Sequence, residues 1–296
     1  MTAPAARRGL DPSDARERNA YAWCRRYTLA HEENFTVVSW LLPKPLRPHF
    51  YAVYAFCRWT DDLGDEAAGD RLALLDAWEA ELRACYEGKR SRPLFIALGR
   101  TVETCAIPQE LFLRLIEANR IDQRKQRFRD IDELLWYCEH SATPVGRMVL
   151  HVLGYHDERR MRLADATCIG LQLANFWQDV SVDLRKGRIY LPQADMRLFG
   201  YDEAALQVGV VNAAFRELMR FEVERARGYF RRGKRLEALV DRRARVDISL
   251  FRLGGEAVLD AIEQFHYDVL TSRPRASRTT KVRLALEACA RLTLGL

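Results

Sequence analysis

The order of apolar and polar residues along the chain is that of amphipathic helices. Apolar side chains recur every three or four positions in six segments, which cover residues 72–86, 109–119, 132–153, 161–182, 202–233 and 254–270. This spacing gathers apolar groups on one side of a helix, whereas a half-buried strand needs strict alternation, which no stretch shows convincingly. The pattern therefore predicts an all-α protein.

Proline and glycine fall between the predicted helices. Examples are Pro108, Gly154 and the pair Gly254 and Gly255, which we expect to separate helical segments. No linker-like stretch and no repeat of solenoid length divides the chain. We therefore expect a single all-helical domain over residues 19–296. Residues 1–18 are polar and rich in Ala and Arg, and we expect them to form a poorly ordered tail.

Two short acidic segments stand out against this background. Asp61 and Asp65 are four residues apart, and so are Asp179 and Asp183. On a helix, this spacing puts both carboxylates of a pair on one face, where they repel unless a cation lies between them. Oxygen ligands without nearby His or Cys favour a hard ion such as Mg²⁺, which commonly shares its ligands with substrate phosphates. The two pairs predict a site that handles diphosphate.

Other polar side chains share the face of the first acidic pair. Tyr54, Arg58, Asp61 and Asp65 follow one another at steps of four, three and four, so all four lie on one stripe of a helix. A stripe that mixes a guanidinium with carboxylates fits the wall of a polar cavity. A solvated helix face with internal Arg–Asp pairs explains this stripe equally well.

The second acidic pair belongs to a similar stripe. Gln172, Asn175, Asp179 and Asp183 are spaced by three, four and four, and each can offer an oxygen atom. A basic turn over residues 185–192 follows, and its arginines are well placed to meet phosphate oxygens. Two such stripes in one chain are hard to explain as two solvated helix faces by coincidence. The second stripe therefore favours a site that binds substrate and metal.

Composition and charge exclude several other classes. The chain has 296 residues, of which 48% are hydrophobic and 30% charged, as is usual for a globular protein. Its seven cysteines contain no Cys-x-x-Cys pair, which argues against a disulfide framework or zinc. The net charge of +6 is spread along the chain without a nucleic-acid-binding module, so we expect no nucleic acid partner. No signal-peptide core or transmembrane run is present, and we expect a cytoplasmic protein.

Residues 54–66 and 171–192, which contain both stripes, resemble the two signatures of the squalene/phytoene synthases. The resemblance extends from about Tyr21 to about Arg275. It implies an isoprenoid-synthase (terpenoid synthase) fold, a helical bundle with a central cavity. Enzymes of this family join two prenyl diphosphates head to head, with Mg²⁺ bridging the acidic helices and the diphosphates.

The resemblance also implies roles for individual residues. It places the metal ligands at Asp61, Asp65, Asn175, Asp179 and Asp183. The residues that bind the diphosphate or line the adjoining pocket are then Tyr54, Arg58, Arg188 and Tyr190, to which we add Gln172 from the second stripe. Tyr137 falls on a helix that lines the cavity near the reacting carbons, so it is a candidate catalytic residue. A core tyrosine with a satisfied hydroxyl is an equally good interpretation of Tyr137.

The chain departs from the family pattern at three places. Most members have a phosphate-binding His-Ser-x-Ser-Phe segment where this chain has residues 31–35, and of these we assign Asn34 and Phe35 to substrate binding. Gln178 replaces the usual Arg before Asp179, and Val182 replaces the usual acid. Each change removes a donor or a charge near the diphosphates. A site that handles one diphosphate tolerates such losses better than a site for two.

This pattern is similar to the bacterial hydroxysqualene synthases of hopanoid synthesis. The similarity implies a diphosphate-releasing carbon–oxygen lyase that converts presqualene diphosphate and water to hydroxysqualene, with Mg²⁺ or Mn²⁺ and without NADPH. One alternative is a prenyltransferase that condenses two prenyl diphosphates into squalene, presqualene diphosphate or phytoene. Another is a noncatalytic member that binds prenyl lipids or scaffolds a partner. We further expect peripheral contact with the inner membrane face and with neighbouring enzymes of the squalene pathway.

Overall fold

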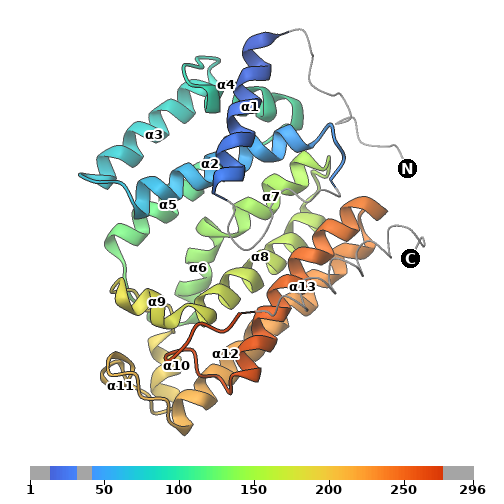
Figure 1. The fold of residues 1–296 in the computed structure, drawn as a ribbon. Coiled ribbons are helices and arrows are strands. Elements are labelled where there is room, and N and C mark those ends of the chain that lie inside the picture. The colour runs from blue at the N-terminus through green and yellow to red at the C-terminus, as the bar shows by residue number, and fades with distance from the viewer. Residues whose placement is uncertain (1–13, 32–41, 276–296) are drawn as a thin grey trace. The chain divides into compact units, whose positions relative to one another are not determined.

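The computed structural model describes residues 14–31 and 42–275, and within these ranges the regular structure is helical (Figure 1). The one β feature there is an isolated bridge between Arg127 and Ile189. The prediction of an all-α protein is confirmed. No described helix is long and apolar enough to cross a membrane.

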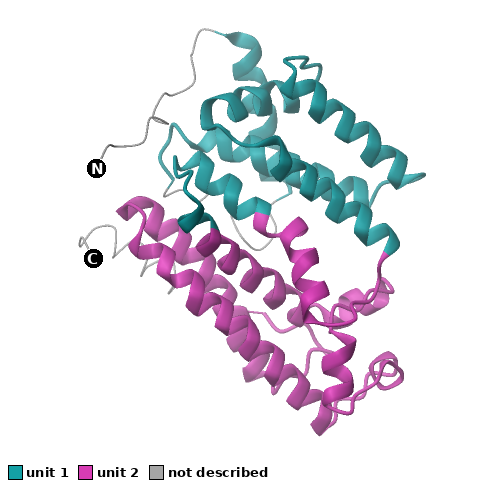
Figure 2. Cartoon of the chain, turned by 180° about the vertical axis from the view of Figure 1, so that it is seen from behind, with its two compact units in different colours: residues 1–124, 144–161 teal, residues 125–143, 162–296 magenta. Residues whose placement is uncertain are grey.

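The helices fall into two compact units, drawn in teal and magenta in Figure 2. Unit 1 comprises residues 1–124 and 144–161, and unit 2 comprises residues 125–143 and 162–296. The helices of unit 1 are α1 (Ala15–Ala30), α2 (Arg47–Asp65), α3 (Arg71–Tyr86), α4 (Pro93–Cys105), α5 (Gln109–Arg124) and nearly all of α7 (Thr143–Val152). That the two units form a single domain stays a prediction.

Unit 2 holds most of the second half of the chain. Its helices are α6 (Ile131–Ser141), α9 (Val180–Arg185), α10 (Gln193–Leu198), α11 (Glu203–Gln207), α12 (Ala213–Gly233), the 3₁₀ helix η1 (Lys234–Ala238) and α13 (Arg242–Gln264). The long helix α8 (Glu158–Gln178) begins in unit 1 and continues into unit 2.

The boundary expected for the N-terminal tail, after residue 18, is wrong because helix α1 begins before it. The carboxylate of Asp14 accepts hydrogen bonds from the backbone N–H groups of Arg16 (2.7 Å) and Glu17 (3.4 Å). A side-chain acceptor at this position satisfies amides that have no partner within the helix. Helix α1 therefore begins at Ala15, so residues 15–18 are helical, and residues 1–13 lie outside the described part.

Three predicted helices are interrupted, two of them at a residue with a local reason. The segment over residues 132–153 splits into α6 and α7 because Pro144, in the first turn of α7, has no N–H to continue the ladder of hydrogen bonds. The segment over residues 202–233 splits at Gly209, whose φ of 72° is left-handed. The third interruption, at Asp179, lies in the candidate site.

Gly254 and Gly255 do not separate helices, contrary to expectation. Both lie inside α13, which begins at Arg242. A Cβ atom on Gly255 would lie 2.4 Å from Cζ of Phe230 on α12 and 2.7 Å from Cδ2 of Leu171 on α8. The glycine is therefore explained by the close packing of three helices in unit 2, and the chain does not turn there.

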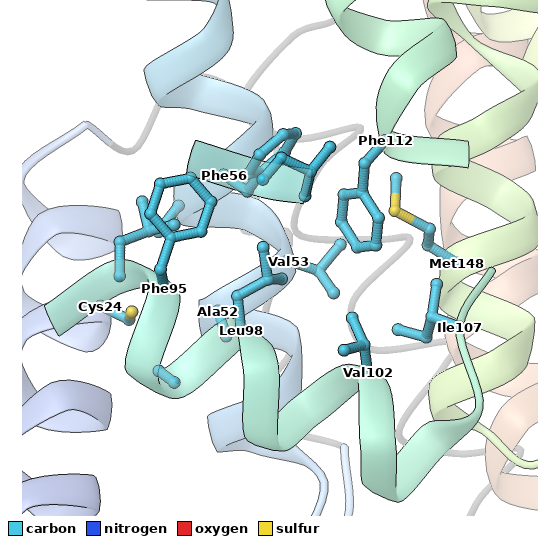
Figure 3. Close-up of a cluster of buried hydrophobic side chains, with 14 of the residues drawn as sticks. Cys24, Ala52, Val53, Phe56, Phe95, Leu98, Val102, Ile107, Phe112 and Met148 are labelled. Carbon is cyan, nitrogen blue, oxygen red and sulfur yellow. The ribbon is translucent and has the colours of Figure 1, made fainter. Parts of the chain in front are cut away.

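An aromatic core fixes the orientation of α2 in unit 1. Phe56 is fully buried, with its ring centroid 4.9 Å from that of Phe112 on α5 and 5.4 Å from that of Trp78 on α3. Figure 3 shows Phe56, Phe95 and Phe112 converging within this cluster. Because this apolar side of α2 faces the core, the stripe with Asp61 lies on another side of the helix.

A buried polar group accompanies this core. The ring of His49 is 1% exposed, and its Nδ1 lies 2.9 Å from Oγ1 of Thr101, which in turn lies 3.0 Å from the hydroxyl of Tyr21. Burial, with a smaller contribution from the charge of Arg100, lowers the pKa of His49 from 6.5 to about 4. The imidazole is therefore neutral in the folded protein at physiological pH.

We expect His49 to make the fold sensitive to acid. Between pH 6.5 and 4, the unfolded chain binds a proton at His49 that the folded chain does not bind, so the free energy of unfolding falls as the pH falls. The wild-type protein should lose about 3 kcal/mol relative to the His49→Gln variant over this range. Urea unfolding of both proteins at several pH values measures the difference. Equal pH dependence in the two proteins would show that His49 is not buried in its neutral form.

Candidate active site

Helix α2 presents Asp61 and Asp65 one turn apart, as the spacing predicts, and solvent reaches both side chains. The surrounding protein nevertheless displaces enough water around Asp61 to raise its pKa to about 7. The charge of Asp65 raises the pKa further, against a hydrogen bond from Asn119 Nδ2 to Asp61 Oδ1 (3.3 Å). A carboxyl group in this condition ionises readily only when positive charge is supplied nearby.

Arg58 pairs with Asp62 in this structure. A terminal nitrogen of the Arg58 guanidinium lies 2.8 Å from Oδ1 of Asp62 and 3.2 Å from Oε1 of Glu66. The hydroxyl of Tyr27 donates to Oδ2 of Asp62 (2.5 Å). This Arg–Asp pair involves Asp62, which lies off the stripe of Tyr54, Arg58, Asp61 and Asp65. The hydroxyl of Tyr54 donates to the carbonyl of His31 (3.1 Å).

The second stripe does not lie on one continuous helix, contrary to the prediction. Helix α8 ends at Gln178, Asp179 interrupts the helix, and α9 begins at Val180. The interruption is one residue long, and the backbone N–H of Asp183 still donates to the carbonyl of Asp179 (2.8 Å). Asp179 and Asp183 therefore remain one turn apart. Asn175 is exposed and Gln172 is half-buried, as expected for a polar stripe.

Two contacts tie Asp179 and its neighbour to the segment after α13. The guanidinium of Arg273 binds both carboxylate oxygens of Asp179, with 2.8 Å between its terminal nitrogen and Oδ2. The buried side chain of Gln178 donates to the carbonyl of Pro274 (2.5 Å). The sequence carried no signal for these contacts, because the paired residues are more than ninety positions apart.

A small hollow in unit 2 brings together three predicted site residues. Asp183, Arg188 and Tyr190 line it, together with apolar residues that include Phe176 and Leu206. The backbone N–H of Arg188 donates to the carbonyl of Asp183 (2.9 Å), which closes the turn between them. Gly187 permits this turn because its φ of 77° is left-handed.

Tyr137 belongs to an aromatic cluster beside this hollow. The rings of Phe176 and Tyr190 are stacked, with centroids 3.9 Å apart, and the Tyr137 centroid lies 6.0 Å from that of Tyr190. Phe128 completes the cluster, with its centroid 5.4 Å from that of Tyr137. Tyr137 and Tyr190 therefore lie together, whereas Phe128 and Phe176 were not recognised as site candidates. The catalytic role of Tyr137 stays a prediction.

Two predicted substrate-binding residues, Asn34 and Phe35, lie outside the described residues. Their roles stay predictions, and so do those of the other substrate-binding residues.

The acidic residues fit a magnesium ion by their chemistry. Over residues 14–31 and 42–275, no three His, Cys, Asp or Glu side chains converge closely enough to hold a metal ion. Mg²⁺ commonly takes only one or two carboxylates and fills its shell with water and substrate phosphates. Two carboxylates one turn apart on α2, and a second pair with the Asn175 amide in unit 2, match that preference. A cation beside Asp61 would also favour the ionised form of this carboxyl group, whose pKa is raised.

Comparison with known proteins agrees with these features. The squalene/phytoene synthase family matches residues 28–280. A 15-cis-phytoene synthase from Synechococcus elongatus is 33% identical, over 86% of this chain and 87% of the relative. The crystal structure of the squalene synthase HpnC from Alicyclobacillus acidocaldarius is 50% identical, with a TM-score of 0.84 over 86% of this chain and 97% of that one.

A second solved structure extends the similarity. A dehydrosqualene synthase in complex with a ligand is 25% identical, with a TM-score of 0.85 over 94% of this chain and 98% of that one. Members of the matched family are enzymes that act on prenyl diphosphates and typically depend on Mg²⁺. The chain belongs to the squalene/phytoene synthase family and has its all-helical isoprenoid-synthase fold.

Proposed function

We propose that this protein is a hydroxysqualene synthase, which converts presqualene diphosphate and water into hydroxysqualene and diphosphate. The proposal rests on the identity and the hydrogen bonding of Gln178. At this position most family members have an arginine, whereas here a neutral, buried amide is bound to the carbonyl of Pro274. It supplies no positive charge for a second diphosphate, and Val182 likewise supplies no carboxylate.

Similarity to known proteins supports a function related to squalene more strongly than one related to phytoene. Identity is 50% with the squalene synthase HpnC and 33% with the cyanobacterial phytoene synthase. The names squalene synthase and phytoene synthase both fit a second candidate function, the condensation of two prenyl diphosphates, which the assay below separates from the first.

The proposed reaction breaks one carbon–oxygen bond and forms another. Diphosphate leaves with the bonding electron pair, the cyclopropylcarbinyl cation rearranges and its ring opens, and a water oxygen bonds to the cationic carbon. The proton lost by that water passes to solvent or to the released diphosphate. Bound Mg²⁺ supplies positive charge that stabilises the leaving oxygens.

The residues of the site fit these steps. Asp61 and Asp65 would hold Mg²⁺ from α2. Asn175, Asp179 and Asp183 would do so in unit 2, where the ion would compete with Arg273, which binds both carboxylate oxygens of Asp179 in this structure. Arg58 beside the acidic pair of α2, and Arg188 beside the acidic pair of unit 2, would each bind diphosphate oxygens through charge-assisted hydrogen bonds. The rings of Tyr137, Phe176 and Tyr190 would stabilise the cation by their faces and exclude all but one water.

An incubation with defined substrates tests the proposal. Purified protein with Mg²⁺ receives presqualene diphosphate or farnesyl diphosphate, each with and without NADPH, and the products are identified by mass spectrometry. We expect hydroxysqualene from presqualene diphosphate, in equal yield with and without NADPH, and no reaction with EDTA. Conversion of farnesyl diphosphate to squalene or presqualene diphosphate, or of geranylgeranyl diphosphate to phytoene in a parallel incubation, would instead establish the condensing enzyme. Turnover of none of these three substrates would favour a noncatalytic prenyl-lipid-binding protein.

The proposed product also bears on location. Hydroxysqualene carries one hydroxyl group on a thirty-carbon hydrocarbon, so it must leave into lipid. We therefore propose a cytoplasmic protein in peripheral contact with the inner membrane face and with the neighbouring enzymes of its pathway.

A further inference from the structure

We propose that Asn119 is a positioning residue that orients the carboxylate of Asp61 for the metal ion, and that Gly64 is present in the acidic motif to admit Asn119. The inference deepens the proposed function and rests on it for the role of Asp61 as a metal ligand. Nothing in the pattern of the acidic motif itself points to Asn119, which is 58 residues away on α5.

The side-chain amide of Asn119 joins two helices of unit 1. Its Nδ2 donates to Oδ1 of Asp61 on α2 (3.3 Å) and to the backbone carbonyl of Leu115 on its own helix (3.1 Å). One turn further along α5, Nε2 of Gln123 donates to the backbone carbonyl of Gly64 (2.9 Å). Asn119 is 8% exposed, so packing as well as hydrogen bonding holds its amide in place.

Gly64 explains how Asn119 comes so close to α2. A Cβ atom built on Gly64 would lie 2.0 Å from Oδ1 and 2.9 Å from Cγ of Asn119. Gly64 lies in the last turn of a helix and has no positive φ, so its backbone does not require glycine. A helical glycine costs roughly 1 kcal/mol relative to alanine. The side chain of Asn119 occupies the space that a Cβ atom would need, which explains why glycine is present despite this cost.

The kind of donor matters for the chemistry of the site. The neighbouring carboxylate, Asp62, is bound by the cation Arg58 and by Tyr27. Asp61 instead accepts a hydrogen bond from a neutral amide, which fixes the orientation of the carboxylate without cancelling its charge. A hydrogen bond to Oδ1 leaves Oδ2 and a second lone pair on Oδ1 for a cation. The two adjacent carboxylates therefore differ: Asp62 is paired with a cation of the protein, whereas Asp61 keeps its charge for a metal ion.

Metal binding in the absence of any prenyl substrate tests this proposal. Mn²⁺, which also accepts oxygen ligands, is titrated into the protein with inorganic diphosphate and followed by electron paramagnetic resonance. Asn119→Leu removes the amide at similar size, and Gly64→Ala pushes the amide away from Asp61. We expect each variant to bind Mn²⁺ about tenfold more weakly than the wild type. In turnover assays with Mg²⁺, each should need more metal for half-maximal rate.

Gln123→Ala is the matched control. It removes a hydrogen bond between the same two helices without touching Asp61, so it should lower the melting temperature while Mn²⁺ affinity stays at the wild-type value. Wild-type affinity in Asn119→Leu and Gly64→Ala, or an equal loss in Gln123→Ala, would overturn the proposal. Because the titration uses inorganic diphosphate, its result is independent of whether the enzyme makes hydroxysqualene.

Discussion

Asp61→Asn is expected to lower turnover about a thousandfold while the protein stays folded. The substitution keeps the shape of the side chain and an oxygen that can accept the hydrogen bond from Asn119. It removes the negative charge that a metal ion needs. The measurement is the rate of diphosphate release from presqualene diphosphate at saturating Mg²⁺, beside thermal unfolding of the same preparation.

The unfolding measurement makes this prediction specific. The pKa of Asp61 is about 7 in the folded protein, above the ordinary value of 3.8, so the free energy of unfolding falls as the pH rises from 3.8 to 7 and stays lowered above pH 7. Asp61→Asn should therefore melt at or above the wild-type temperature at pH 8, whereas a misfolded variant would melt below it. Glu110→Gln, the same chemical change on the surface of α5, should retain wild-type turnover. Substantial turnover by Asp61→Asn would remove Asp61 from the metal site.

Phe56→Ala is expected to lower the free energy of unfolding by about 3–5 kcal/mol. The ring is fully buried and contacts the rings of Trp78, Phe95 and Phe112, so its removal loses aromatic contacts and leaves a cavity. The cluster joins α2 to three other helices of unit 1, and little of the space can close without moving a helix. Urea unfolding followed by circular dichroism gives the change.

The matched control for this variant is Leu198→Ala. Leu198 is 70% exposed at the end of α10, and its truncation should change the free energy of unfolding by less than about 0.5 kcal/mol. A loss below about 1 kcal/mol in Phe56→Ala would mean that unit 1 does not rely on this aromatic cluster. Equal losses in the two variants would contradict the difference in burial.

The helical class and the two acidic pairs were predictable because both are encoded by local spacing. The predicted helix over residues 72–86 matches α3 within one residue at its start and at its end. The four-residue step places Asp61 and Asp65 on one face wherever the helix lies in the fold. Helices α1 and α4 were not predicted. The capping acid of α1 lies in a segment interpreted as tail, and α4 carries apolar residues on more than one side.

The contacts of the site were not predictable, because they depend on which helices pack together. In each contact, one partner is chosen among several residues of the same chemistry. The contacts are the ion pair of Arg58 with Asp62, the hydrogen bond from Asn119 to Asp61 and the binding of Asp179 by Arg273. The interruption at Asp179 was hidden for another reason. The helical pattern continues on both sides, and a one-residue break leaves the spacing of the stripe intact.

Gly255 has a consequence for efforts to make this enzyme more heat-resistant. Exchanging helical glycines for alanine is a routine choice in such work, because it restricts the unfolded chain. Gly255 lies in the middle of α13 and would rank high on any scan by helix propensity. An added methyl group would collide with Phe230 and Leu171, so Gly255 should be left unchanged in such work.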